Sequence, residues 1–123
     1  MAVLIIFCYN VTMKEKYKKE LNKLKKQIVT QYKPEKIILF GSLASGKIKK
    51  NSDIDLLVIK NSKKDYWSRA KEIAKIINID VPADVLNIST KELSDRLALK
   101  DFFILDIINN GKVIYETAKS RKR

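Results

Sequence analysis

The stretch from Lys36 to Lys60 constrains the fold more than any other part of the chain. It opens with a short apolar run, Ile37 to Phe40, which has the length and the bounding glycine of a strand. After a polar connection, the run from Asp53 to Ile59 alternates, so its two aspartates share one face and the apolar residues between them share the other. We therefore predict two neighbouring strands joined by a polar connection.

The two aspartates predict a metal site. Carboxylates on the face of an apolar strand are costly to bury without a partner. Residues two apart on a strand lie about 6.6 Å apart along it, so Asp53 and Asp55 can converge on one cation or on a close pair. Mg²⁺ takes oxygen ligands and keeps substrate phosphates in its remaining positions. Gly41 and Ser42, which end the preceding strand, can offer backbone N–H groups and a hydroxyl to those phosphates.

These residues resemble the signature of the nucleotidyltransferase superfamily with the polymerase-beta-like fold: Gly41-Ser42, a gap, and then Asp53-Ile54-Asp55. The short chain and the wording GSLASG…SDIDLLV resemble its smallest branch, the minimal nucleotidyltransferases. The resemblance implies an α/β (α+β) fold in which helices flank a small mixed sheet. Family members often carry an arginine in the turn where this chain has Ser45, a difference that bears on nucleotide binding rather than on metal binding.

A third carboxylate is expected from the strand Pro82 to Ile88. In the family an aspartate on this strand completes the metal triad, and Asp84 is the acidic residue that matches it. The alternatives are that Asp84 is a surface residue of an edge strand, or that Asp80 takes the role. In the connection, Lys47 either helps to neutralise the nucleotide phosphates or belongs to the loop surface, and Lys49 and Lys50 share that choice.

Composition limits the chemistry. A chain of 123 residues makes one domain with a substantial core. It has no histidine, which excludes Ser-His-Asp triads and His-ligated zinc, and its single cysteine excludes an internal disulfide. This cysteine usage fits a reducing cytoplasm. The formal net charge of +12 favours polyanionic partners, or else reflects a solvated lysine-rich surface.

The remaining segments follow from periodicity and caps. An apolar stripe predicts a helix from Met13 or Lys14 to Lys33. Further helices are expected at Asp65–Asn78, after the capping box Ser89–Glu92, and at Asp101–Asn110, with a closing strand at Lys112–Glu116. Trp67, beside the apolar stripe of the first of these helices, is expected to pack into the core rather than to stack on a nucleotide base.

We divide the chain into an N-terminal extension (1–13), a minimal nucleotidyltransferase domain (14–117) and a basic tail (118–123) expected to be disordered. The apolar run Ala2 to Tyr9 is too short to span a bilayer and lacks the flanks of a signal peptide, so no membrane partner is expected. It could instead form an added strand or a dimer contact. We favour an extension without a catalytic role, in which case Met13 would be the natural start.

The resemblance implies transfer of AMP from ATP to a hydroxyl. Two Mg²⁺ ions, or Mn²⁺, would be held by Asp53, Asp55 and Asp84, with Gly41, Ser42 and Lys47 binding the nucleotide. Minimal nucleotidyltransferases are commonly paired with a HEPN ribonuclease toxin, which they neutralise by placing AMP on a tyrosine, and we expect such a partner here. Two alternatives are transfer to a small molecule or RNA end supplied by another subunit, and a module that neutralises a toxin by binding alone. The oligomeric state is left open.

Overall fold

The structure is a computed structural model that describes residues 2–48 and 51–121, with side chains from residue 13 onward. No helix in this described part is long and apolar enough to cross a membrane. In chain order the elements are α1 (Ala2–Gln31), β1 (Lys36–Phe40), α2 (Gly41–Ala44), β2 (Ile54–Lys60), α3 (Tyr66–Ile76), β3 (Ala83–Ser89), α4 (Thr90–Ala98), α5 (Phe102–Asn110), β4 (Lys112–Glu116) and α6 (Ala118–Arg121).

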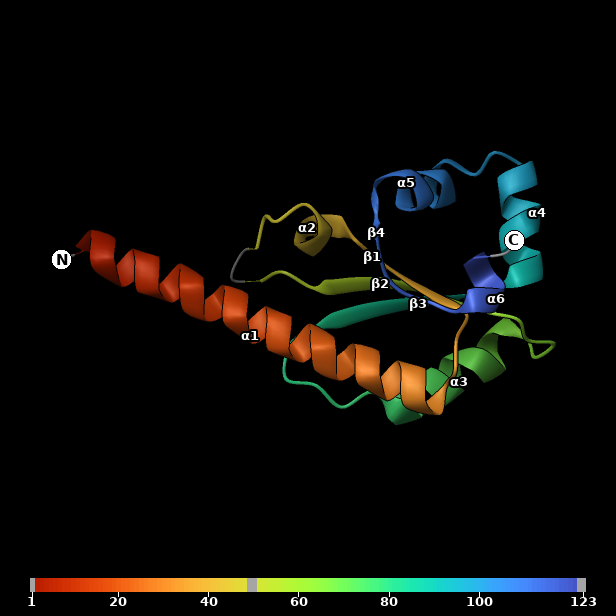
Figure 1. Ribbon diagram of the computed structural model, residues 1–123, viewed down its shortest axis with the longest axis horizontal. Helices are drawn as coiled ribbons and strands as arrows, with labels where there is room; N and C mark the ends of the chain where they lie inside the picture. The colour runs from red at the N-terminus through yellow and green to blue at the C-terminus, as the bar shows by residue number, and fades with distance from the viewer. Residues whose placement is uncertain (1, 49–50, 122–123) are drawn as a thin grey trace.

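The four strands form one mixed sheet in the order β3-β2-β1-β4. Strand β1 runs antiparallel to both β2 and β4, whereas β2 and β3 are parallel and are connected through α3. Figure 1 shows α1 and α3 on one side of the sheet and α4 and α5 on the other. The expected small mixed sheet flanked by helices is therefore confirmed.

Alternation along β2 divides the interior into two cores. Ile54, Leu56 and Val58 pack with α1 and α3, whereas Leu57 and Ile59 pack with α5 on the opposite face. The apolar stripe predicted for the first helix is confirmed too, because Tyr17, Leu24 and Ile28 of α1, and Tyr32 directly after it, are buried in the first of these cores. Burying one such aliphatic side chain fully stabilises the fold by about 1.5–3 kcal/mol.

The N-terminal boundary differs from the prediction. Helix α1 begins at Ala2, not at Met13 or Lys14, and runs without interruption to Gln31, so the added-strand alternative for this segment is wrong. Its first turns reach beyond the edge of the sheet (Figure 1). The side chains of residues 1–12 lie outside the described part of the chain.

Two further expectations were wrong. The tail from Ala118 to Arg121 is a short helix rather than disordered: Thr117 Oγ1 accepts a hydrogen bond from the Ser120 N–H at 3.2 Å, and Arg121 pairs with Glu116 at 3.4 Å. Residues 122–123 lie outside the described residues.

Trp67 does not pack into the core, since it is 72% exposed and stacks edge-on against the neighbouring Tyr66 ring. The inward positions of α3 are taken instead by Arg69 and Ile73, which lie four residues apart on one face of the helix.

Candidate active site

Two carboxylates and an aromatic ring lie in one row across the sheet, at the end where β1 finishes and β2 and β3 begin. Asp55 on β2 is paired with Phe40 on β1 and with Asp84 on β3. Residues directly opposite each other on adjacent strands project from the same face of a sheet. Asp53 precedes Asp55 by two residues, at the entry to β2. The backbone register therefore brings the three predicted aspartates to one edge and one face.

Beside this row lies a cavity of about 620 Å³. Its lining includes four of the residues expected from the sequence, Ser42, Lys47, Asp53 and Asp55, and three more polar residues, Ser45, Asn51 and Ser52. The cavity is therefore hydrophilic, with a lysine and hydroxyl groups on the same wall as two carboxylates. Such a lining suits a phosphate-bearing ligand better than an apolar one.

Gly41 is the first residue of α2 and turns the chain directly after β1, in a backbone conformation that suits glycine. Its φ is +74°, in the left-handed region that L side chains rarely adopt. A Cβ at this position would collide with Oδ2 of Asp55. The glycine thus lets the backbone of the turn approach the carboxylate directly, so the turn and the aspartate belong to one site.

The ionisation of Asp55 reports how closely the carboxylates are grouped. Partial burial raises the pKa of Asp55 above its ordinary value, and the negative charges of Asp84 and then Asp53 raise it further. Concentrated negative charge of this kind is unfavourable in the protein alone and becomes favourable once positive charge is supplied.

Helix α1 fixes the loop that enters β2. The hydroxyl of Tyr17, which is buried, donates a hydrogen bond of 2.5 Å to the backbone carbonyl of Ser52, the residue before Asp53. Sequence reasoning missed Asn51 and Ser52 as cavity residues and missed the role of Tyr17. The only local signal was the polar character of the loop. The contact between Tyr17 and Ser52 joins residues 35 positions apart, so it produces no periodic pattern in the sequence.

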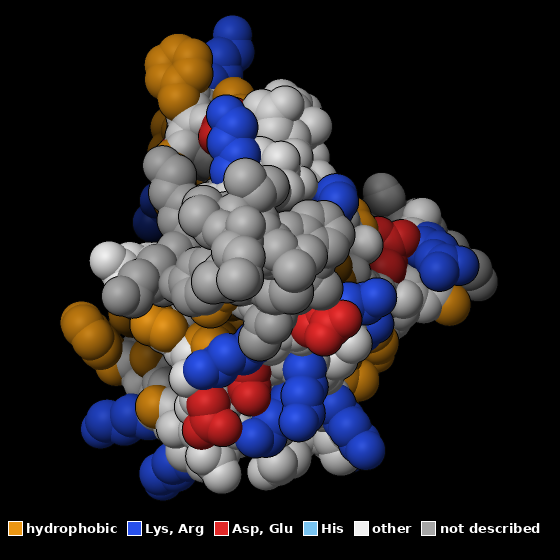
Figure 2. Space-filling view, turned by 90° about the vertical axis from the view of Figure 1, so that its left-hand side faces the viewer, with side chains coloured by type: hydrophobic (Ala, Val, Ile, Leu, Met, Phe, Trp, Pro, Cys, Tyr) orange, Lys and Arg blue, Asp and Glu red, His pale blue; other side chains and the backbone are white. Residues whose placement is uncertain are grey.

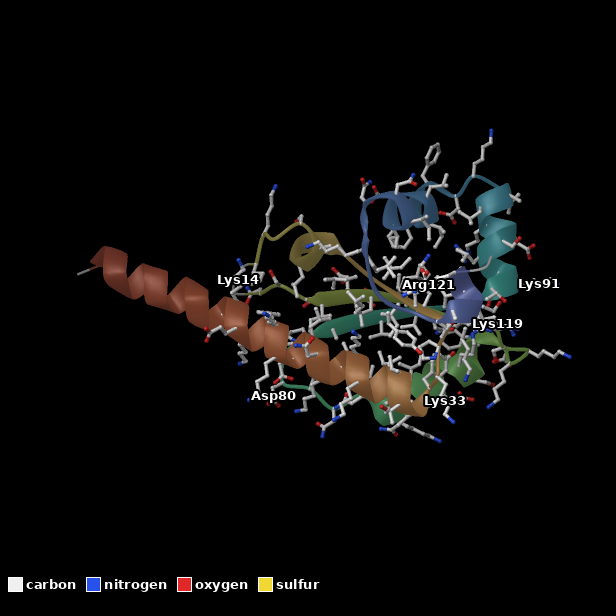
Figure 3. The ribbon with its side chains drawn as sticks, viewed as in Figure 1. Lys14, Lys33, Asp80, Lys91, Lys119 and Arg121 are labelled. Atoms are coloured by element: carbon white, nitrogen blue, oxygen red, sulfur yellow. The ribbon has the colours of Figure 1, made fainter. Side chains whose placement is uncertain are left out.

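Some predicted residues lie apart from the cavity. Asp84 is exposed at the start of the edge strand β3 and does not line the cavity, although it stands in the same row as Asp55. The fallback candidate Asp80 lies on the other side, against α1, where its backbone N–H donates to Glu20 Oε2 at 3.1 Å (Figure 3). Lys49 and Lys50 fall outside the described residues.

The donor set fits a divalent cation such as Mg²⁺ or Mn²⁺, which takes carboxylate oxygens. A Cβ on Gly41 would meet the Asp55 carboxylate, and Asp53 and Asp55 both line the polar cavity, so cation-binding oxygens adjoin a space that can hold phosphates. Within residues 2–48 and 51–121, however, no three acidic, histidine or cysteine side chains are already gathered into a ligand set. The carboxylates would have to turn toward a cation from positions that share one face.

The mixed sheet carries a Gly-Ser turn beside Asp55 on β2 and Asp84 on β3. This arrangement defines the class of protein as a polymerase-beta-like nucleotidyltransferase. Residues 22–120 match the family described as "Polymerase beta, Nucleotidyltransferase". The match spans most of the chain, so the chain belongs to this family and is a nucleotidyltransferase. The comparison with curated proteins finds no match.

Solved structures agree on the fold. A toxin–antitoxin complex with AMP-PNP is similar to this chain with a TM-score of 0.55 and 24% identity, over 82% of this chain and 77% of that one. A mutant of the toxin–antitoxin pair MntA-HpeT gives a TM-score of 0.52 at 24% identity, with the same coverage of both chains. A protein from Sulfolobus solfataricus gives 0.51 at 19% identity, over 90% of this chain and 86% of that one.

Proposed function

We propose that this chain transfers AMP from ATP to a hydroxyl group, and that the acceptor is a tyrosine of a partner HEPN ribonuclease toxin, so that the chain acts as an antitoxin in the cytoplasm. One observation carries the proposal: the row formed by Asp55 and Asp84 adjoins the Gly41 turn and its polar cavity. Phosphoryl-transfer chemistry needs this combination, because its catalysis is mostly positioning and charge stabilisation.

Each element of the site has a role in this proposal. Gly41, Ser42 and Lys47 bind the β- and γ-phosphates, so that pyrophosphate departs from a site already suited to its charge. Asp53, Asp55 and Asp84 hold the divalent cations, which supply the positive charge that offsets the phosphates. Asp84, the carboxylate on the edge strand, faces the acceptor and receives its proton. None of these roles requires a histidine, which the chain lacks.

The partner is proposed from the similar structures and from charge. Two of the similar structures are toxin–antitoxin assemblies, and one of these contains AMP-PNP, an ATP analogue. The charge of +12 favours a partner with an acidic surface. On the face shown in Figure 2, Lys and Arg side chains surround the few acidic ones in the lower part of the molecule. We also propose that residues 14–117 are the part that performs the transfer.

The proposal is tested by incubating the chain with labelled ATP, Mg²⁺ and a HEPN-domain protein as the acceptor, followed by peptide mass spectrometry. We expect AMP on a tyrosine of the partner. Asp53→Asn and Asp55→Asn should abolish the transfer while the fold is retained, as judged by circular dichroism. Asp80→Asn is the matched control, because Asp80 is exposed and bonds to Glu20 of α1 through its backbone N–H, which the substitution keeps, and it should transfer normally. Unchanged rates in both site variants would refute the assigned roles.

A further inference from the structure

Helix α1 contacts both of the loops that lead into the aspartate-bearing strands β2 and β3. On the β2 side, the hydroxyl of Tyr17 donates its hydrogen bond to the carbonyl of Ser52, directly before Asp53. On the β3 side, Oε2 of Glu20 accepts a hydrogen bond of 3.1 Å from the backbone N–H of Asp80. Because residues three apart lie on the same face of a helix, one face of α1 holds the entry to both strands.

A backbone hydrogen bond between the two loops closes these contacts into a ring. The N–H of Ile54 donates to the carbonyl of Pro82 at 2.9 Å. Ile54 follows Ser52 by two residues, and Pro82 follows Asp80 by two. This contact ring therefore runs from α1 through the β2 loop and the β3 loop and back to α1. Asp53 is the residue that lies between the two contacts of the β2 loop.

Asp53 depends on the contact ring because the pairing of β2 with β3 begins one residue after it. Strand β2 starts at Ile54, and its ladder with β3 pairs Asp55 with Asp84. Asp53 is exposed and lines the polar cavity, whereas Ser52 and Ile54 on either side of it are buried. Anchoring both buried neighbours fixes the direction in which the carboxylate of Asp53 leaves the backbone.

The burial of Glu20 is a second sign that α1 does more than cover the sheet. Glu20 is only 5% exposed. Burying a carboxylate is unfavourable unless hydrogen bonds compensate for it, and an apolar side chain at this position would cover the sheet at a lower cost. The hydrogen bond to the loop that enters β3 therefore explains the position of this glutamate better than helix packing does.

We propose that Tyr17 and Glu20 are positioning residues of the metal site. By anchoring the two loops, they keep the carboxylate of Asp53 directed into the polar cavity beside Asp55, where the cation binds. Both residues act through the backbone of the loops rather than by contact with the cation. This inference rests on the proposed function, since it concerns how the metal assigned there is held.

Binding of Mn²⁺ alone tests the role of Tyr17 without any reaction. The free ion is followed by electron paramagnetic resonance, at a temperature well below the thermal midpoint of every variant, so that all chains are folded. Tyr17→Phe should raise the Kd for Mn²⁺ about three- to tenfold, the factor that one hydrogen bond contributes. An unchanged Kd in Tyr17→Phe would overturn the inference.

Tyr32→Phe is the matched control for Tyr17→Phe. Tyr32 is buried in the same core, but within the described residues its hydroxyl has no hydrogen-bond partner. Removing this hydroxyl should leave the Kd for Mn²⁺ at the wild-type value. An equal rise in both variants would show that any loss of a hydroxyl from this core weakens the site, and the inference would be wrong.

Glu20 is tested by a pair of variants that lose the same charge. Glu20→Gln keeps a side-chain oxygen that can accept from the Asp80 N–H, whereas Glu20→Met has a similar length and no such acceptor. The Kd for Mn²⁺ should therefore be about three- to tenfold higher in Glu20→Met than in Glu20→Gln. Equal values in the two variants would contradict the positioning role of Glu20.

Asp55→Asn, measured in the same way, separates this inference from the proposed function. If Asp55→Asn binds Mn²⁺ as tightly as the wild type, the metal assignment is wrong, and the proposed function and the inference fall together. If Asp55→Asn weakens binding while Tyr17→Phe and Glu20→Met do not, the proposed function stands and the inference alone is wrong.

Discussion

At the scale of single residues, the surroundings of Asp55 disfavour its ionised form. Burial first, and then the charges of Asp84 and Asp53, raise its pKa from the ordinary value of 3.8. The native protein therefore binds this proton more tightly than the unfolded chain does. The resulting stability is fully present below pH 3.8 and is lost as the pH rises through the native pKa.

Asp55→Asn should accordingly raise the thermal midpoint at pH 7 in EDTA, because the variant carries no unfavourable charge there. The advantage over the wild type should shrink as the pH is lowered toward 4. Scanning fluorimetry between pH 4 and 8 measures this difference, with Asp80→Asn as the control outside the row. A variant that is less stable than the wild type at pH 7 without metal would contradict the account of this cluster.

Gly41 offers a test of the close approach between the turn and Asp55. Gly41→Ala introduces both a strained φ, at a cost of about 1–2 kcal/mol, and a collision with the Asp55 carboxylate. Gly46→Ala is the matched control, since Gly46 has a φ of +79° with no atom close to its Cβ position. Urea unfolding should show a loss in both variants, and AMP transfer should fail only in Gly41→Ala. Equal activity in the two variants would show that the approach is not needed.

At the scale of elements, the start of α4 ties the two faces of the sheet together. Ser89 and Glu92 form the predicted capping box, and Glu92 also pairs with the guanidinium of Arg69 from α3. Arg69 is 2% exposed, and its Nε donates to Asn87 Oδ1 at 2.8 Å. Burial alone raises the pKa of Glu92, but the hydrogen bonds from Ser89 and the charge of Arg69 outweigh it and lower the pKa overall.

Glu92→Gln should lower the free energy of unfolding at pH 7 by about 1–2 kcal/mol. This value lies between those of exposed and buried ion pairs, because Glu92 is partly exposed whereas Arg69 is buried. The contribution of Glu92 is present above its ordinary pKa of 4.5 and is lost as the pH falls through the lowered native value, so wild type and variant should converge in acid. Urea unfolding at pH 7 and pH 3.5 measures both effects. Glu72→Gln, which removes an exposed pair with Lys64, should change stability far less, and an equal loss would argue against the buried pair.

The local sequence pattern was sufficient to predict those elements whose structure is determined by residues close together in the chain. Alternation in β2 and the box at Ser89 were predictable because the residues involved lie within one strand or one helical turn. Trp67 was misassigned because helical spacing does not say which flank of the stripe meets the sheet, and the buried place went to Arg69, whose charge could be paired by Glu92. The helical start of α1 was missed because the apolar run from Ala2 carries no helix-start signal.

At the scale of the whole molecule, the candidate site depends on strand pairing. The spacing of Gly41, Ser42, Asp53 and Asp55 could be read from one continuous stretch. The position of Asp84 could not, because it depends on the parallel register between β2 and β3. Two basic residues of the tail, Lys119 and Arg121, also lie away from the site, at the end of the sheet opposite α2 (Figure 3).

The central claim is that the aspartate row and the Gly-Ser turn together bind a metal–nucleotide complex. The most direct measurement is anomalous diffraction from crystals grown with Mn²⁺ and AMP-PNP. The account predicts manganese peaks bound to the carboxylates of Asp53 and Asp55, with the phosphates in the cavity lined by Ser42 and Lys47. Manganese or phosphates bound away from this row, with the cavity beside Gly41 empty, would contradict it.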